Sequence, residues 1–211
     1  MSDMHIIDDD SLRAWPLPMP DDEGDKEERG RVLVIAGSPE MPGAALLAGT
    51  AALRAGAGKL TFAAPASVAP LIGVARPEAR VIPLPETAAG GFALHGVEKV
   101  LPLLQRCNAV LVGPGMQDEP AICAFVLALL PHLKEVPLVL DAGGMNVVRR
   151  QLQAVDAGAH EQRYVNSFSS PVLLTPHAGE MAHLSGMDKD AVQDDPPEAA
   201  RTAARRWNAL I

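Results

Sequence analysis

Residues 31–37 read RVLVIAG, an arginine followed by a run of apolar residues that ends in glycine. An apolar run of this length is typical of a strand that is buried on both faces, as in a parallel sheet. Similar runs follow at residues 60–65, 79–84, 109–115, 137–144 and 171–177. The sequence therefore predicts six strands in one buried sheet.

Helical stretches lie between these runs at residues 43–56, 93–105 and 119–133, and a further one follows at residues 191–210. The first is rich in Ala and Leu and ends at Gly56, a common residue at a helix end. The last has acidic residues early and arginines late, which matches the helix dipole. Strands that alternate with helices predict an α/β fold with a mainly parallel sheet.

The chain divides into an acidic, proline-containing arm at residues 1–29 and one domain at residues 30–211. The arm holds ten acidic and three basic residues and so carries −7 of the net charge of −8. We expect it to be solvated and partly disordered. Hydrophobic residues make up 48% of the chain and aromatic residues 3%, which favours helices packed on a sheet over a β-sandwich. An acidic arm on a near-neutral body argues against nucleic acid as a partner.

Cys107 and Cys123 are the only cysteines, and no spacing of Cys and His indicates a zinc site. We expect two buried thiols rather than a disulfide. The N-terminus shows no secretory signal, and no apolar run reaches the roughly 18 residues of a membrane span. We therefore expect a cytoplasmic protein that does not bind a membrane.

Four predicted strands end in glycine or polar residues. The segments are GS at residues 37–38 with PGAA at 42–45, GPGM at 113–116, DAGGMN at 141–146 and TPHAGE at 175–180. Ligands bind at the carboxyl ends of the strands in an open parallel sheet, so these segments predict one cleft. Glycine lets a ligand approach the backbone, and the first N–H groups of a helix attract anions.

Each segment also has a purely structural interpretation. Asp141 can cap the next helix, Glu180 can stabilise a first helical turn, and His177 can be a structural histidine. No GxGxxG follows the first strand, and residues 37–38 do not lead into the Gly-Lys-Ser/Thr of a P-loop. A Rossmann dehydrogenase and a P-loop NTPase are therefore disfavoured.

The order of four segments resembles the ADP- or ATP-dependent NAD(P)H-hydrate dehydratases, which also occur as the C-terminal domain of bifunctional NAD(P)H-hydrate repair enzymes. The segments are VLVIAGSPEMPGAALLAGTAALRAGAGKLTFAAP at residues 32–65, AVLVGPGM at 109–116, VLDAGGMN at 139–146 and LLTPHAGEMAHLSG at 173–186. The resemblance covers residues 26–210 and implies a ribokinase-like, three-layer α/β/α fold. It also implies that ADP or ATP phosphorylates the 6-hydroxyl of the hydrated nicotinamide ring, after which phosphate is eliminated and NAD(P)H is restored.

The resemblance also implies roles for individual residues. Those that it places in the substrate site are Gly43, Ala44, Ala45, Gly113, Gly115, Asp141, Asn146 and His177. Glu180 is expected to lie near Mg²⁺ and the phosphates as a metal ligand. The implied partners are the hydrated dinucleotide, an adenine nucleotide, further copies of the chain in a homo-oligomer, and an epimerase that is fused or separate.

The sequence departs from the family pattern in several places. Gln117 stands where the family has the last glycine of Gly-Pro-Gly-Leu-Gly, and Gly143 stands where it has a second aspartate. The family's catalytic aspartate lies in a Gly-x-Gly-Asp loop that follows a Val-Leu-Lys-Gly strand, and residues 1–211 contain neither. We therefore expect the C-terminal part of the fold to be missing and no catalytic residue within the chain.

This expectation has a physical consequence for the end of the chain. The last apolar run would have no neighbour on its outer edge, and Trp207 and Leu210 would lack packing partners. We expect the chain to be poorly soluble or oligomeric. Two alternative functions stay open: a ribokinase-like kinase of a vitamin precursor, and a catalytically incomplete relative that binds a dinucleotide or a protein.

Overall fold

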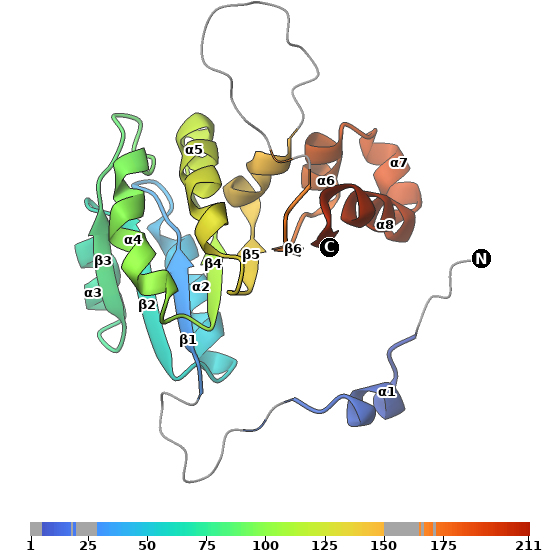
Figure 1. The fold of residues 1–211 in the computed structure, drawn as a ribbon, viewed down its shortest axis with the longest axis horizontal. Helices are drawn as coiled ribbons and strands as arrows, with labels where there is room; N and C mark the ends of the chain where they lie inside the picture. Colours follow the sequence, from blue (N-terminus) through green and yellow to red (C-terminus); the bar gives the residue numbers. More distant parts are fainter. Residues whose placement is uncertain (1–5, 18, 20–28, 150–164, 166, 171) are drawn as a thin grey trace, which may run out of the picture.

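The computed structural model describes residues 6–17, 19, 29–149, 165, 167–170 and 172–211. Its strands form one seven-stranded sheet in the order β3-β2-β1-β4-β5-β6-β7 (Figure 1). The strands are β1 (Arg31–Ile35), β2 (Lys59–Pro65), β3 (Arg80–Leu84), β4 (Ala109–Val112), β5 (Leu138–Leu140), β6 (Val172–Leu174) and β7 (Ala209–Leu210). All neighbouring strands of the sheet are parallel, as predicted.

Helices lie on both faces of the sheet, which gives the three layers that were expected. One face carries α2 (Pro42–Arg54) and α3 (Ala69–Ala75), which pack on β1, β2 and β3. The helices of the other layer are η1 (Leu94–Gly96), α4 (Val97–Leu104), α5 (Glu119–Leu129), η2 (Leu130–His132), η3 (Ala142–Val148), α6 (Ala178–Ser185), α7 (Lys189–Asp194) and α8 (Pro196–Trp207). A short helix, α1 (Asp9–Ala14), lies in the arm.

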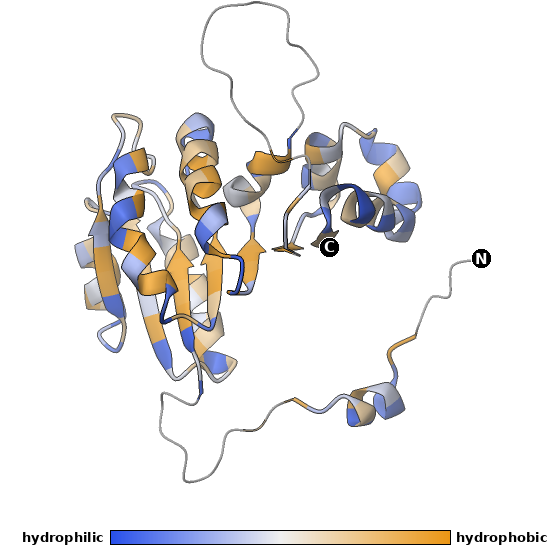
Figure 2. Ribbon diagram, viewed as in Figure 1, coloured by the Kyte–Doolittle hydropathy of each residue, from blue (hydrophilic) through white to orange (hydrophobic). Residues whose placement is uncertain are grey.

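The two faces of the sheet bury separate apolar clusters. Leu33 and Ile35 of β1 belong to the larger cluster, which includes residues of α4, α5 and α8. Val34, between them, belongs to the smaller cluster with residues of α2 and α3. Successive side chains of a strand point to opposite faces, so a strand between two helix layers must be apolar throughout. Figure 2 shows β1, β2 and β4 mostly in the hydrophobic colours.

One part of the sheet carries helices on one side only. Leu111, Val139, Leu173 and Leu210 follow one another in register from β4 to β7. Leu111 packs against the cluster under α2, so these four residues face the α2 side. Leu111 is thus partly covered by α2, whereas at the other end of the row Leu173 is 38% and Leu210 62% exposed. We call these four residues the open row.

The C-terminal region differs from the prediction of one helix at residues 191–210. The structure has two helices, α7 and α8, and then the strand β7. The side chain of Asp195 accepts a hydrogen bond from the N–H of Glu198 and caps α8, whose first turn contains Pro196. Proline cannot donate the backbone hydrogen bond that would continue α7. Asn208, with φ of 52°, ends α8.

The outer edge of β6 is not uncovered, so that prediction is wrong. β7 pairs with it, with Val172 opposite Ala209 and Leu173 opposite Leu210. Trp207 is also packed, at 1% exposed, contrary to the prediction. A strand of two residues leaves no pattern in a sequence, which is why the pairing could not be foreseen.

The arm is described at residues 6–17, 19 and 29. It forms the helix α1 there, and the side chain of Asp8 caps this helix by accepting a hydrogen bond of 2.9 Å from the N–H of Ser11. The expectation of partial disorder concerns residues 1–29, of which 1–5, 18 and 20–28 lie outside the described part. The division of the chain at residue 29 stays a prediction.

The two cysteines are free thiols, as predicted, but the prediction that both are buried is right only for Cys123. Cys123 is buried in α5 and Cys107 is half-buried before β4. Burial, with a smaller contribution from the nearby carboxylate of Glu119, raises the pKa of Cys123 to about 11. Among the described helices, none has the length and apolar character needed to cross a membrane.

Candidate active site

The four polar strand ends meet at one edge of the sheet. β1, β4, β5 and β6 are neighbours in the sheet and run in the same direction, so their carboxyl ends lie side by side (Figure 1). This arrangement confirms that the segments after these strands share one edge. Ligands bind at this edge in open parallel sheets.

The segment after β1 turns sharply into α2. The buried hydroxyl oxygen of Ser38 accepts a hydrogen bond of 3.2 Å from the N–H of Met41, which holds the turn. α2 begins with Pro42, and no side chain caps its first turn. A side-chain carbon added to Gly43 would meet no atom within 4 Å. The start of α2 is therefore open to a ligand, and its N–H groups favour an anion.

The next two residues of this segment take different positions. Ala44 is half-buried and lines a cleft, whereas Ala45 is fully buried. The methyl group of Ala45 lies 3.4 Å from the position that a side-chain carbon on Gly37 would take. Ala45 therefore supports the turn from within the core, and its side chain does not face a ligand.

The glycines after β4 allow close packing of backbones. Gly113 has φ of 127°, and a side-chain carbon there would overlap the carbonyl group of Asp141. Gly115 has φ of 66°, and a side-chain carbon there would lie 2.8 Å from the carbonyl oxygen of Met41. The N–H of Gly37 also donates to the carbonyl of Pro114 over 2.8 Å. These contacts fix the segments after β1 and β4 against each other as one wall.

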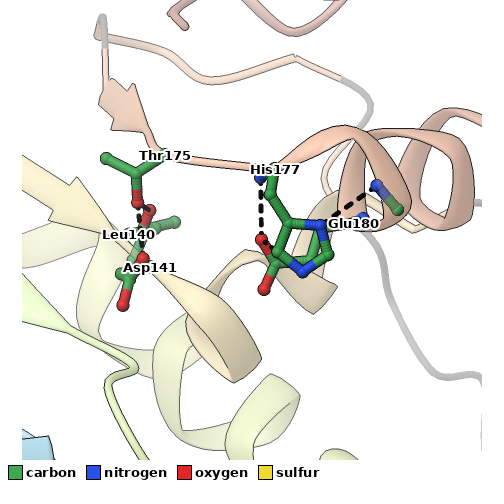
Figure 3. Close-up of polar contacts among 6 residues, drawn as sticks. Leu140, Asp141, Thr175, His177 and Glu180 are labelled. Carbon is green, nitrogen blue, oxygen red and sulfur yellow. Dashed lines mark hydrogen bonds and ion pairs between the residues drawn. The ribbon is translucent and has the colours of Figure 1, made fainter. Parts of the chain in front are cut away.

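Asp141 and Thr175 join the ends of β5 and β6. The hydroxyl of Thr175 donates a hydrogen bond of 2.6 Å to the carboxylate of Asp141 (Figure 3). The backbone N–H of Asp141 donates to the carbonyl of Val112 over 3.0 Å, so the residue is held on both sides. The side chain of Asp141 does not cap η3. The structural interpretation of Asp141 as a helix cap is therefore wrong.

Asn146 was expected near Asp141 in the same cleft. It lies in η3, and the residues that line the cleft do not include it. Gly143, at the position of the family's second aspartate, precedes it in η3. A side-chain carbon on Gly143 would lie 3.0 Å from a terminal carbon of Ile122 in α5, so a carboxylate there would press on the apolar core.

His177 and Glu180 form a capping box at the start of α6. The Nδ1 atom of His177 accepts hydrogen bonds from the N–H groups of Gly179 (3.0 Å) and Glu180 (3.3 Å). The Oε2 atom of Glu180 accepts one of 2.9 Å from the N–H of His177 (Figure 3). This geometry bears out the structural interpretation of Glu180 in a first helical turn. With Nδ1 as acceptor, a neutral His177 carries its proton on Nε2, and its side chain is 73% exposed.

A cleft of about 480 Å³ connects several of these segments. Its lining residues are Ala44, Leu47, Ala48, Ala51, Leu111, Pro114, Val139, Asp141 and Thr175. It therefore joins the start of α2, the end of β4 and the Asp141–Thr175 pair. His177 and Glu180 are not among its lining residues. A larger hollow, of about 830 Å³, lies at the amino ends of β1 and β2, away from the ligand-binding edge.

Sequence reasoning missed the side chains that connect the loops. Besides Thr175, the carboxylate of Glu86 accepts from Ser67, and Asp118 accepts from the hydroxyl of Thr87 over 2.7 Å. Further along the edge, Gln117 donates to Glu40 over 2.7 Å. These pairs join residues 19 to 77 positions apart, so no local motif could reveal them. The one available signal was the position of Thr175 directly after a strand.

The described residues hold no group of three or more His, Cys, Asp and Glu side chains that could bind a metal ion. Glu180 has one carboxylate oxygen in the capping box and is 31% exposed. Mg²⁺ often takes one or two carboxylates and completes its shell with phosphate oxygens and water. Glu180 fits such a role as a single ligand, and these residues alone do not build a metal site.

The chain is similar to a known protein family over most of its length. The family model for NAD(P)H-hydrate dehydratase matches residues 32–211. An ADP-dependent (S)-NAD(P)H-hydrate dehydratase from Xanthomonas campestris is 41% identical over 95% of this chain and 63% of its own length. A bifunctional NAD(P)H-hydrate repair enzyme from Moorella thermoacetica is 37% identical over 94% of this chain and 36% of its own length. The chain thus spans 63% and 36% of these relatives.

Solved structures show the same fold. An ADP/ATP-dependent NAD(P)H-hydrate dehydratase from Bacillus subtilis, co-crystallised with ATP and Mg²⁺, superposes with a TM-score of 0.70 at 31% identity. The match covers 95% of this chain and 62% of that structure. A ribokinase-like superfamily protein from Enterococcus faecalis superposes with a TM-score of 0.69 over 89% of this chain and 58% of its own, at 19% identity. This second likeness concerns the fold alone and identifies it as ribokinase-like.

Proposed function

The chain belongs to the NAD(P)H-hydrate dehydratase family, and from this membership we propose that it acts in the repair of hydrated NAD(P)H. The observation that carries the proposal is the match over residues 32–211, which includes all four polar strand ends. These ends lie at one edge of the sheet, where such a substrate would bind. The alternative hypothesis, a kinase of a vitamin precursor, has no family match of comparable extent to support it.

The start of α2 is our proposed site for an anionic group of the dinucleotide. Its first turn has no side-chain cap, and the space beside Gly43 is open. Backbone N–H groups at such a helix start attract phosphate without a lysine or arginine. Ala44 and the wall at Gly115 border this position.

Asp141, Thr175 and His177 are proposed to orient the substrate. The Asp141 carboxylate, held by Thr175, can accept a hydrogen bond from a substrate hydroxyl. The Nε2–H of a neutral His177 can donate to a phosphate or amide oxygen. We assign binding and orientation to these residues and assign no proton transfer to them.

The proposed reaction uses ADP or ATP as phosphate donor. The 6-hydroxyl oxygen of the hydrated ring attacks the terminal phosphorus and loses its proton, and the nucleotide leaves one phosphate shorter. Loss of that phosphate together with a ring proton then restores the double bond of NAD(P)H. Mg²⁺, when bound, would neutralise charge on the donor phosphates, with Glu180 as its protein ligand.

The setting of the activity is also proposed. We propose the cytoplasm, because the reduced cysteines suit a reducing compartment. We propose a homo-oligomer, because an exposed apolar surface such as the open row favours association. An epimerase, fused or separate, is a further proposed partner, since several relatives are bifunctional repair enzymes.

The direct test is titration of the 211-residue chain with hydrated NADH, monitored by isothermal calorimetry. We expect saturable binding, weakened at least fivefold by Asp141→Ala and by His177→Ala, and no competition from hydroxymethylpyrimidine or hydroxyethylthiazole. Catalysis is tested by adding ADP or ATP with Mg²⁺ and recording the return of the absorbance of reduced nicotinamide. Glu98→Ala, an exposed site on α4, serves as the control variant.

Each outcome distinguishes one of the three functions. Competition by the small alcohols would favour the kinase. Binding of hydrated NADH without turnover, whichever donor is added, would favour a dinucleotide-binding relative. Wild-type affinity in both variants would refute the site assignment and leave the family membership intact.

A further inference from the structure

The hollow at the amino ends of β1 and β2 is strongly basic. It has a volume of about 830 Å³, and the described residues that line it include four cationic side chains, those of Arg31, Lys59, Arg80 and Arg106. The first three of these begin β1, β2 and β3, which are neighbours in the sheet. Glu78 is the one carboxylate among the same described residues. We call this surface the basic hollow.

This concentration of positive charge is local. The net charge of the chain is −8 and the arm carries −7, which leaves −1 for the domain that contains the basic hollow. Glu78 cannot balance all four cations, since its carboxylate also lies 3.7 Å from the guanidinium of Arg76. Burial raises the pKa of the Cys107 thiol, which lines the hollow, and the charge of Arg31 opposes that rise. A cleft lined by one sign of charge attracts ions of the other sign, so the basic hollow suits an anionic partner.

The acidic arm joins the body at the rim of the basic hollow. The carbonyl of Gly30 accepts hydrogen bonds of 3.1 Å from the N–H groups of Gly58 and Lys59, both of which line the hollow. The N–H of Gly58 also donates to the carbonyl of Arg29 over 3.3 Å. Figure 1 shows the arm entering the sheet at the start of β1. The arm is thus attached directly beside the four cationic side chains.

The arm is most acidic immediately before this attachment. Residues 21–28 read DDEGDKEE, with six acidic side chains and one basic. Neighbouring strands are about 4.8 Å apart, so the start of β3 lies about 10 Å from that of β1. Four extended residues span about 13 Å. The length of residues 25–28 therefore suffices to reach from Arg29 to Arg80.

The arm also lies near the start of β1 on the other side of this acidic segment. Met19 lines a smaller hollow, of about 460 Å³, together with Arg29, Gly30 and Arg31. Both described ends of the segment are therefore close to the basic hollow. This arrangement favours the arm of the same chain over the arm of a second copy as the anionic partner.

We propose that the basic hollow is a docking surface for the acidic segment at residues 21–28 of the same chain. The carboxylates of this segment pair with the cationic side chains at the starts of three strands. Docking neutralises a surface that would otherwise attract phosphorylated molecules. The proposal is independent of the proposed function, because the basic hollow lies at the opposite edge of the sheet from the candidate active site.

The test uses the half-buried thiol of Cys107 as a probe of the basic hollow. Cys107 reacts with the dianionic reagent dithiobis(nitrobenzoate) and with neutral iodoacetamide, and mass spectrometry of its peptide gives both rates. The ratio of the rates reports the potential in the hollow, because the thiolate fraction affects both alike. We expect Asp25→Asn, Glu27→Gln and Glu28→Gln together to raise the ratio about tenfold, the lower end of the effect of a charged cleft.

The matched control removes the same charge elsewhere in the arm, with Asp3→Asn, Asp9→Asn and Asp10→Asn together. It should change the ratio less than about twofold at 0.1 M salt, where charges more than about 10 Å away are screened.

A second comparison changes the basic hollow itself. Arg80→Gln with Arg106→Gln should reduce the response to the changes at residues 25, 27 and 28 to less than about half, because two of the four cations are gone. Arg205→Gln, at an exposed site on α8, should leave that response intact.

Three results would overturn the proposal. Equal ratios in the wild type and the variant at residues 25, 27 and 28, or equal increases in both arm variants, would show that the segment does not dock. A ratio that depends on protein concentration would assign the hollow to the arm of a second copy. Protection of Cys107 in the wild type by inorganic pyrophosphate, unchanged by the arm variants, would assign it to a small phosphorylated ligand. None of these results bears on the binding of hydrated NADH, which is measured separately.

Discussion

Thr175 donates its hydroxyl to a carboxylate that lies 34 positions earlier in the sequence. The bond holds Asp141 at the cleft, so its loss should loosen the carboxylate without changing the fold. Thr175→Val keeps the shape of the side chain and removes the donor. We predict that it weakens binding of hydrated NADH about fivefold, which corresponds to about 1 kcal/mol.

The control for this prediction is Thr175→Ser, which retains the hydroxyl and should bind nearly as well as the wild type. Calorimetric titration gives both values. Equal affinities for the valine variant and the wild type would show that the bond has no part in substrate binding.

Cys123 gives a prediction about stability at high pH. Its pKa is raised by burial from its ordinary value of 9.0 to about 11, so between these pH values the folded state holds a proton that the unfolded state loses. This contribution to stability is fully present below pH 9 and is lost as the pH rises towards 11. We predict that the free energy of unfolding falls by up to roughly 3 kcal/mol over this range because of Cys123.

Urea unfolding at several pH values measures this slope. Cys123→Ala should flatten it, although the variant is less stable at every pH because a buried side chain is shortened. The half-buried Cys107, whose pKa burial also raises, provides the comparison through Cys107→Ala. An identical slope in Cys123→Ala and the wild type would contradict the assignment.

At the scale of single elements, α6 tests whether His177 and Glu180 cap a helix, bind a ligand or do both. Removing either partner breaks the capping box, and we expect His177→Ala and Glu180→Ala each to lower the free energy of unfolding by about 1 kcal/mol. Urea unfolding measures that loss. Titration with hydrated NADH then separates the roles, since a residue that only caps α6 leaves the affinity unchanged.

A stability equal to that of the wild type in both variants would refute the capping box itself. Glu180→Gln is the matched variant, because an amide oxygen still accepts the hydrogen bond from His177 and a charge is removed. If Glu180 is a ligand of Mg²⁺, Glu180→Gln should weaken the binding of Mg²⁺ with nucleotide while retaining the stability.

The elements differ in how far the sequence could predict them. The runs that became β1 to β6 are apolar because helices or other core residues pack on them. Burial of this kind requires apolar side chains, and a continuous apolar run can be recognised in the sequence. α3 was not foreseen, since seven residues give too short a periodic pattern. α6 was anticipated only as the first helical turn that Glu180 could stabilise. The break between α7 and α8 lies at Pro196. The proline alone does not predict a break between two helices, because proline also fits the first turn of a single helix.

The site was predictable to a similar degree. The strand ends could be placed at one edge because a parallel sheet brings carboxyl ends together. The reason for each glycine could not be foreseen, because Gly113 and Gly115 accommodate neighbouring backbones that come from distant segments. The bond from Thr175 to Asp141 likewise depends on the neighbourhood of β5 and β6 in three dimensions.

For the whole molecule, the open row predicts self-association. Its leucines and valine form a continuous apolar line across four strands, and the described residues leave the end of that line exposed. Apolar surface in contact with water favours association. We predict that the chain migrates in size-exclusion chromatography above its monomer mass of 22.2 kDa. Leu173→Glu should return it towards that mass.

Leu71→Glu is the matched control, since Leu71 is 61% exposed on α3 and lies outside the open row. It should leave the association unchanged. A wild-type chain that is monodisperse, monomeric and cooperatively melting would contradict the prediction, and so would equal effects of the two glutamate variants.

The contact between Gly113 and Gly144 also limits how this protein can change over generations. A side-chain carbon on Gly144 would lie 2.5 Å from the carbonyl oxygen of Val112, and one on Gly113 would lie 2.7 Å from the nitrogen of Gly144. Because each obstacle is main chain, no second substitution can make room for a larger residue. In a library randomised at both positions, surviving clones should retain glycine at both, whereas Gly43, with open space beside it, should vary freely among clones selected for folding alone.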